Sequence, residues 1–88
     1  MLNVESYSPK ASEVHPFPNP GWEGFRLGES EKGLAFTLWN VQGQLVMQGV
    51  FGPMGGVRGL EYLTPGLYLL RWTDSDGKPQ RSTWQKVP

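Results

Sequence analysis

The only histidine of the chain, His15, is the first residue that could carry chemistry, as a general base or as a metal ligand. Either role needs partners at a suitable spacing, and Glu13 is the one carboxylate close to it in the sequence. A single histidine next to Pro16 is more typical of an exposed strand position than of a reactive site. We therefore expect His15 to lie on a surface strand.

The segment Asp74-Ser75-Asp76-Gly77 has the Asp-x-Asp-Gly spacing that opens many calcium-binding loops. The rest of that pattern, including the closing glutamate, is missing. Asp and Gly are also the residues that tight turns favour, through local hydrogen bonds and positive φ. The segment is therefore predicted to be a hairpin turn between two strands.

The other reactive side chains form no recognisable catalytic set. Cysteine is absent, which excludes thiolate nucleophiles, disulfides and thiolate metal sites. With one histidine, no convincing Ser-His-acid group can be assembled. Some of the glutamates could pair for glycoside hydrolysis, but nothing marks any two as partners: Glu23, Glu29, Glu31 and Glu61. We expect a protein that is not an enzyme and needs no cofactor.

Charge and hydropathy exclude further classes of partner. Eight basic and eight acidic residues give a net charge of zero, and the basic residues form no run. Nucleic-acid binding draws most of its affinity from phosphate neutralisation, so it is not expected. The longest apolar run, 67–70, is far shorter than the ~20 residues of a spanning helix, so no direct membrane insertion is expected either. The first residues lack the features of a signal peptide, so a role outside the cytoplasm would make the chain part of a longer precursor.

The tryptophans leave two interpretations open. Trp22 lies among Pro and Gly residues in a predicted loop, whereas Trp39, Trp72 and Trp84 lie on predicted strands. Exposed aromatic rings on a β-sandwich can stack on sugars, as in carbohydrate-binding modules. Trp72 is expected to fill the core, because a buried indole removes a large apolar area from water.

These side chains must be positioned by strands, because twelve glycines and eight prolines leave no helical periodicity. We predict one all-β domain at 13–88, preceded by a linker or leader at 1–12. Its expected fold is a seven-stranded, immunoglobulin-like antiparallel β-sandwich. The predicted strands are 13–17, 25–27, 34–41, 44–51, 57–62, 67–73 and 80–87.

An ordered set of motifs is more specific than any one of these features. Phe17-Pro18-Asn19-Pro20 is followed by Gly24-Phe25, and then by a strand–Gly43–strand hairpin at 38–46. Next come Leu63-Thr64-Pro65-Gly66-Leu67-Tyr68 and the terminal Gln85-Lys86-Val87-Pro88. In this order and at this spacing, residues 13–88 resemble the C-terminal sorting domain of proteins exported by the type IX secretion system of Bacteroidota.

The resemblance implies a fold and a function. The domain would be an immunoglobulin-like sandwich that directs an N-terminal cargo domain from the periplasm across the outer membrane to the cell surface or medium. Its partners would be the outer-membrane translocon, a shuttle barrel protein and a sortase-like cysteine protease that removes the domain. The residues that match the family motifs are Pro18, Asn19, Pro20, Gly24, Gly43, Gly66, Tyr68, Lys86 and Val87.

One departure concerns the end of the chain. Family members commonly end on an apolar or basic strand residue after Lys-Val, whereas this chain has Pro88 there. A terminal edge strand offers a row of free donors and acceptors to which a partner strand can pair. We therefore expect the last strand to be an open edge, with Pro18 and Pro20 protecting the other end of the domain. The alternative function is a carbohydrate-binding or adhesive module of a cell-surface protein.

Overall fold

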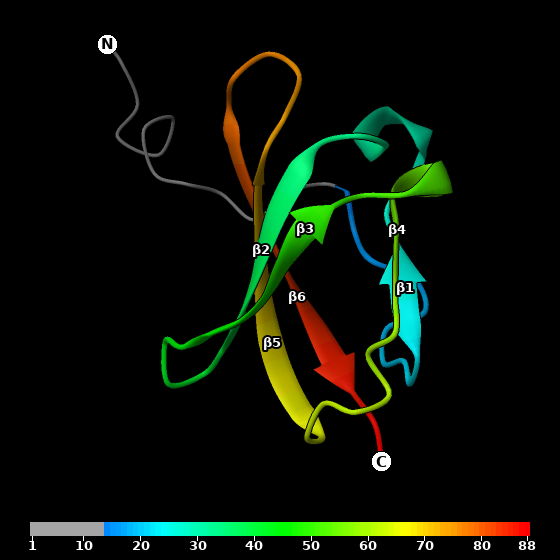
Figure 1. Ribbon diagram of the computed structural model, residues 1–88, viewed down its shortest axis with the longest axis vertical. Coiled ribbons are helices and arrows are strands. Elements are labelled where there is room, and N and C mark those ends of the chain that lie inside the picture. The colour runs from blue at the N-terminus through cyan, green and yellow to red at the C-terminus, as the bar shows by residue number, and fades with distance from the viewer. Residues whose placement is uncertain (1–13) are drawn as a thin grey trace, which may run out of the picture.

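The structure, a computed structural model of the protein, describes residues 14–88 and consists of two antiparallel β-sheets that face each other across one core (Figure 1). The larger sheet has four strands in the order β3-β2-β5-β6, and the smaller sheet pairs β1 with β4. The elements are β1 (Gly24–Arg26), η2 (Glu29–Glu31), β2 (Ala35–Asn40), β3 (Leu45–Val50), η3 (Pro53–Gly55), β4 (Gly56–Arg58), β5 (Gly66–Thr73) and β6 (Pro79–Lys86).

The hairpin between β2 and β3 is confirmed. Gly43 has a φ of +82°, the positive value that a tight turn requires of glycine. The Asn40 side chain stabilises the same turn, because its Oδ1 accepts hydrogen bonds from the backbone N–H groups of Gln42 and Gln44, both at 3.0 Å. The turn residues thus fix the register of the two strands.

The hairpin between β5 and β6 is built around Asp74. Its Oδ1 accepts hydrogen bonds from the Asp76 and Lys78 backbone N–H groups, and its Oδ2 accepts one from the Gln80 side chain, each at 2.9 Å. Hydrogen bonds from the backbone, led by that of Lys78, hold the pKa of Asp74 below its ordinary value. The Asp-x-Asp-Gly segment is therefore a hairpin turn, as predicted, and its first carboxylate is used by the turn itself.

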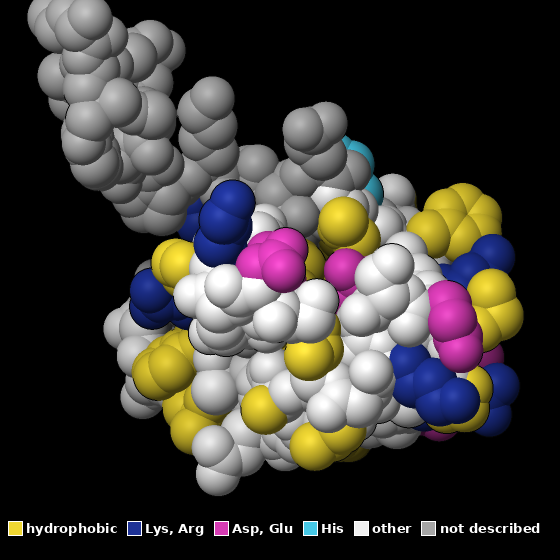
Figure 2. All heavy atoms as spheres, turned by 90° about the horizontal axis from the view of Figure 1, so that it is seen from above, with side chains coloured by type: hydrophobic (Ala, Val, Ile, Leu, Met, Phe, Trp, Pro, Cys, Tyr) yellow, Lys and Arg dark blue, Asp and Glu magenta, His cyan; other side chains and the backbone are white. Residues whose placement is uncertain are grey.

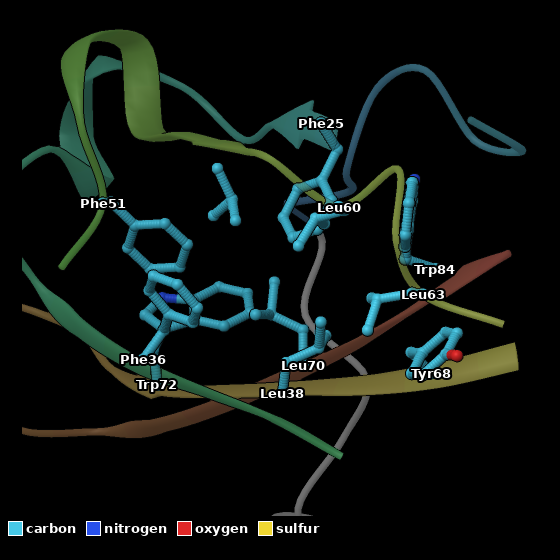
Figure 3. Close-up of a cluster of buried hydrophobic side chains, with 11 residues drawn as sticks. Phe25, Phe36, Leu38, Phe51, Leu60, Leu63, Tyr68, Leu70, Trp72 and Trp84 are labelled. Atoms are coloured by element: carbon cyan, nitrogen blue, oxygen red, sulfur yellow. The ribbon is translucent and has the colours of Figure 1, made fainter. Parts of the chain in front are cut away.

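The core lies between the two sheets and is largely aromatic (Figure 3). Tyr68, Leu70 and Trp72 occupy alternate positions along β5 and all point inward, because successive side chains of a strand point to opposite faces. Trp72 packs edge-to-face against Phe51, with ring centroids 5.9 Å apart. The other buried members are Phe25, Phe36, Leu38, Val57, Leu60, Leu63 and Trp84.

The predicted count of seven strands is wrong for the described part of the chain, which contains six. The expected strand at 13–17 is reduced to one antiparallel bridge between Phe17 and Arg26, while Glu13 and the predicted linker lie outside the described residues. Pro16, Pro18 and Pro20 explain the difference, because proline has no backbone N–H to donate to a ladder. The expected strand at 57–62 is also shorter, since Gly59, with a φ of +80°, follows directly after β4.

Candidate functional site: a clasp on the terminal strand

The Asn19 side chain takes the place of a neighbouring strand on the outer edge of β6. Its Nδ2 donates a hydrogen bond to the Thr83 carbonyl oxygen at 3.1 Å, and its Oδ1 accepts one from the Gln85 backbone N–H at 2.9 Å. A side-chain amide has one carbonyl and one NH₂ group, so it can reproduce the donor and acceptor of a peptide unit. Asn19 thereby satisfies groups on β6 that would otherwise face solvent.

The backbone of Gly21 continues this contact toward the end of the chain. The Gly21 N–H donates to the Gln85 carbonyl at 2.9 Å, and the Gly21 carbonyl accepts from the Val87 N–H at 2.8 Å. Residues 18–21, which we call the clasp, thus make four hydrogen bonds to β6 and the residue after it through Asn19 and Gly21, and a fifth joins Pro18 to the Trp84 side chain. In Figure 1 the blue N-terminal segment reaches the lower end of the molecule, where β6 ends.

The expectation of an open terminal edge is therefore wrong over residues 83–87. Pro18 and Pro20 flank the residue that closes this edge, rather than protecting the other end of the domain. Both prolines follow cis peptide bonds, at Phe17-Pro18 and Asn19-Pro20. The Pro-Asn-Pro motif and the terminal Gln-Lys-Val motif are thus parts of one structure.

Trp84 anchors the clasp to the core. Its indole N–H donates a hydrogen bond to the Pro18 carbonyl oxygen at 2.9 Å. The ring is fully buried and contacts Phe25 and Tyr68, with centroids 5.2 and 6.4 Å away (Figure 3). A buried indole needs a partner for its N–H, and here the partner is the clasp backbone.

Two glycines allow the close approaches at this end of the molecule. A Cβ at Gly21 would lie 2.8 Å from the Pro18 carbonyl oxygen and 3.1 Å from the Trp84 ring. A Cβ at Gly24 would lie 2.0 Å from the Val57 carbonyl oxygen, where β1 pairs with β4. Neither position has room for another residue without movement of the backbone.

Lys86 is buried, with 2% of its surface exposed, although its side chain carries a charge. Its Nζ donates a hydrogen bond to the Val87 carbonyl at 2.9 Å and lies 5.9 Å from the centroid of the Trp22 ring, a cation–π arrangement. The ion pair between Lys32 and Glu29 is the only one among the described residues, so no described carboxylate pairs with Lys86. Lysine is rarely buried to this extent unless it is paired, and here the Val87 carbonyl and the Trp22 ring are its polar and aromatic partners.

Gly66 and Tyr68 lie on β5 beside the last residues of β6. Gly66 pairs with Lys86, and Tyr68 pairs with Trp84, across β5 and β6. The Tyr68 hydroxyl donates a hydrogen bond to the Thr64 carbonyl, which holds the turn that precedes β5. Burial, and to a smaller extent the nearby Tyr62, raises the pKa of Tyr68 above its ordinary value, so this hydroxyl stays protonated.

Most of the motif residues therefore gather around the end of β6, whereas Gly43 lies toward the opposite edge of the larger sheet. Gly43 lies in the β2–β3 turn, where it has a structural role. Sequence reasoning missed Gly21 and Trp84 as members of the site. The available signals were the position of Gly21 directly after the Pro-Asn-Pro motif and that of Trp84 on the inward-facing period of β6.

The side chains first considered for chemistry lie elsewhere. His15 is exposed but precedes the first strand, so it does not lie on a surface strand. Within residues 14–88, no three His, Cys, Asp or Glu side chains gather in a way that could hold a metal ion. No helix in the same range is long and apolar enough to cross a membrane.

Comparison of the chain with protein-family models, curated proteins and solved structures finds no significant match.

Proposed function

We propose that this domain is the C-terminal sorting signal of a cargo protein that the type IX secretion system exports, with an immunoglobulin-like sandwich as its fold. The observation that supports the proposal most is the contact between Asn19 and Gln85. It joins the aromatic-Pro-Asn-Pro motif to the terminal Gln-Lys-Val motif, which lie 66 positions apart. Two of the motifs on which the resemblance rests are thus in direct contact.

In this role the domain is a substrate that other proteins recognise, and it performs no catalysis. The translocon and the shuttle barrel bind it during passage from the periplasm, and the sortase-like protease then separates it from the cargo at the cell surface. The clasp serves this function by covering the terminal edge until a partner engages it. An edge without such cover would pair with other strands, which leads to aggregation.

The terminal block provides the group that we expect the export machinery to read. Lys86 is a cation held beneath a half-exposed aromatic ring, Trp22, which is 52% exposed. When Trp22 moves aside, the ammonium becomes available to a carboxylate of a partner. A buried charge of this kind contributes strongly to specificity when the partner supplies the matching charge.

The experiment that tests the function is export of a reporter. Residues 13–88 are fused behind a signal peptide and a reporter in a host with a working type IX system. The intact domain should send the reporter to the surface or medium. Lys86→Met keeps the buried aliphatic chain and removes the charge, and it should lower export about tenfold or more. Lys78→Met, in the exposed β5–β6 turn, is the matched control and should be exported normally.

Two controls make the outcome decisive. The melting temperature of each variant shows whether the sandwich still folds. A reporter that stays in the periplasm with the intact domain, in a host that exports its own cargo, would contradict the proposed function. Equal export of the Lys86 and Lys78 variants would leave the sorting function standing and remove the role of Lys86. Deleting residues 86–88 is less informative, because it also removes a buried side chain and the hydrogen bond between Val87 and Gly21.

A carbohydrate-binding or adhesive module is the second candidate, and one observation favours it. Phe17 and Trp22 are more than half exposed and line a groove of about 650 Å³ on the side of β1 and β4, together with Arg26 and Arg58. In Figure 2, hydrophobic side chains lie among charged ones on the right, the side on which Figure 1 places β1 and β4.

The other tryptophans argue against a sugar-binding row. Trp72 and Trp84 are buried, and Trp39 is only partly exposed. The two exposed rings of the groove are each in contact with a cation, Arg26 over Phe17 and Lys86 over Trp22. Binding to a glycan panel that disappears on Trp22→Ala would favour this second candidate over the sorting function.

A further inference from the structure

A row of polar side chains crosses all four strands of the larger sheet on its outer face. Gln48 on β3 pairs with Thr37 on β2, Thr37 pairs with Arg71 on β5, and Arg71 pairs with Arg81 on β6. Phe36 and Leu38, the neighbours of Thr37 on β2, are buried in the core, so the row points away from it. The sorting function proposed above uses none of these residues.

The pair of arginines in this row is unfavourable by itself. Like charges on directly opposite residues of neighbouring strands destabilise a sheet, because their Cβ atoms are only about 5 Å apart. Both side chains are exposed, and neither makes an ion pair with any of residues 14–88. Asp74, the acidic residue directly after β5, uses both carboxylate oxygens in hydrogen bonds of the β5–β6 hairpin. The two arginines thus lie opposite each other without an ion-pair partner among residues 14–88.

The arginines line a hollow that is large enough for a ligand. A groove of about 780 Å³ runs over this face, and its lining includes Thr37, Gln48, Arg71 and Arg81. Leu69 lines it as well, and Ala35 and Val50, which pair with each other, provide further apolar contact. Hydroxyl and amide groups therefore lie beside the two cations, with apolar surface next to them.

We infer that this row is a binding site for a phosphate monoester. Such a group carries a charge of about −1.5 to −2 at neutral pH, which matches the two unpaired arginines. A guanidinium group can donate two parallel hydrogen bonds to a phosphate. Arg71 and Arg81 lie directly opposite each other on neighbouring strands and line one groove, so one phosphate is within reach of both. Thr37 and Gln48 can donate hydrogen bonds to the remaining oxygens or to the group that carries the phosphate. A bound phosphate would also relieve the repulsion between Arg71 and Arg81.

The test is titration calorimetry of the whole chain at constant ionic strength. The probes are inorganic phosphate, glucose 6-phosphate and vesicles that contain phosphatidate, with glucose as the uncharged control. These arms distinguish a free phosphate, a phosphorylated sugar and a lipid headgroup as the source of the group. We expect binding of at least one phosphate probe and none of glucose, with Arg81→Gln weakening that binding about tenfold or more.

Arg58→Gln is the matched control, because Arg58 is an exposed arginine on the other sheet. It should bind like the unchanged protein. Without ligand, the melting temperature of Arg81→Gln should equal or exceed that of the unchanged protein, because the substitution removes a repulsion between like charges. A loss of binding in this variant would then not be due to unfolding. Failure of all three phosphate probes to bind, or equal binding by the unchanged protein and Arg81→Gln, would overturn the inference.

Discussion

Replacing Gly24 with alanine should lower the free energy of unfolding by more than about 3 kcal/mol. The new Cβ would lie 2.0 Å from the Val57 carbonyl oxygen and 3.0 Å from the Arg58 Cα, so β1 and β4 could not keep their present spacing. Both contacts are with backbone, which cannot move aside as a flexible side chain does. Urea denaturation followed by circular dichroism measures the change.

Gly49→Ala is the matched control for this prediction. Gly49 also lies in a strand, but its Cβ would meet only the Phe36 ring at 3.5 Å, an ordinary van der Waals distance. Its stability should change by less than about 1 kcal/mol. Equal stability of the two variants would show that the close approach of β1 to β4 is wrong.

Replacing Trp84 with alanine should destabilise the domain by about 3–5 kcal/mol. The substitution leaves a cavity between Phe25 and Tyr68 and removes the hydrogen bond to the Pro18 carbonyl oxygen. Small domains have a total stability of about 5–15 kcal/mol, so much of the protein would be unfolded at moderate temperature. The clasp would also lose its attachment to the core.

Trp22→Ala provides the comparison for Trp84. Trp22 is half exposed, and its removal should cost less than about 1 kcal/mol while exposing the Lys86 ammonium to water. Circular dichroism is the suitable probe for both variants, because fluorescence changes whenever a tryptophan is removed. A Trp84 variant as stable as the Trp22 variant would contradict the buried position of this ring.

The sequence predicted the larger sheet well because its strands alternate clearly and its turns contain the expected residues. Leu38 and Leu70 face inward on a period of two, and Gly43 and Asp74 mark the two hairpin turns. These patterns depend only on residues close together in the sequence, so they can be recognised without knowledge of the fold. The bounds of the strands differ from the prediction by at most one residue, except at the prolines and at the end of β4, which Gly59 follows.

The first predicted strand is wrong because of its prolines. Pro16 and Pro18 lack the backbone N–H groups that a ladder requires, so only Phe17 between them forms a bridge, with Arg26. The site could be predicted only as separate motifs. No pattern near Asn19 in the sequence indicates that its side-chain amide would pair with the edge of a strand more than 60 positions away, because that contact depends on how the two sheets pack. Burial of Lys86 and Trp84 follows from the same packing.

Amide hydrogen exchange tests the central claim, that the clasp closes the terminal strand, most directly. In the unchanged protein the backbone amides of Gln85 and Val87 should be protected, because each donates a hydrogen bond to the clasp. Asn19→Ala removes the acceptor of the Gln85 amide and should speed its exchange about tenfold or more. Asn40→Ala is the control, because the Asn40 side chain likewise accepts hydrogen bonds from two backbone N–H groups, in the turn between β2 and β3. It should speed the exchange of the Gln42 and Gln44 amides and leave those of Gln85 and Val87 protected. Rapid exchange of Gln85 and Val87 in the unchanged protein, or no effect of Asn19→Ala on Gln85, would contradict the account.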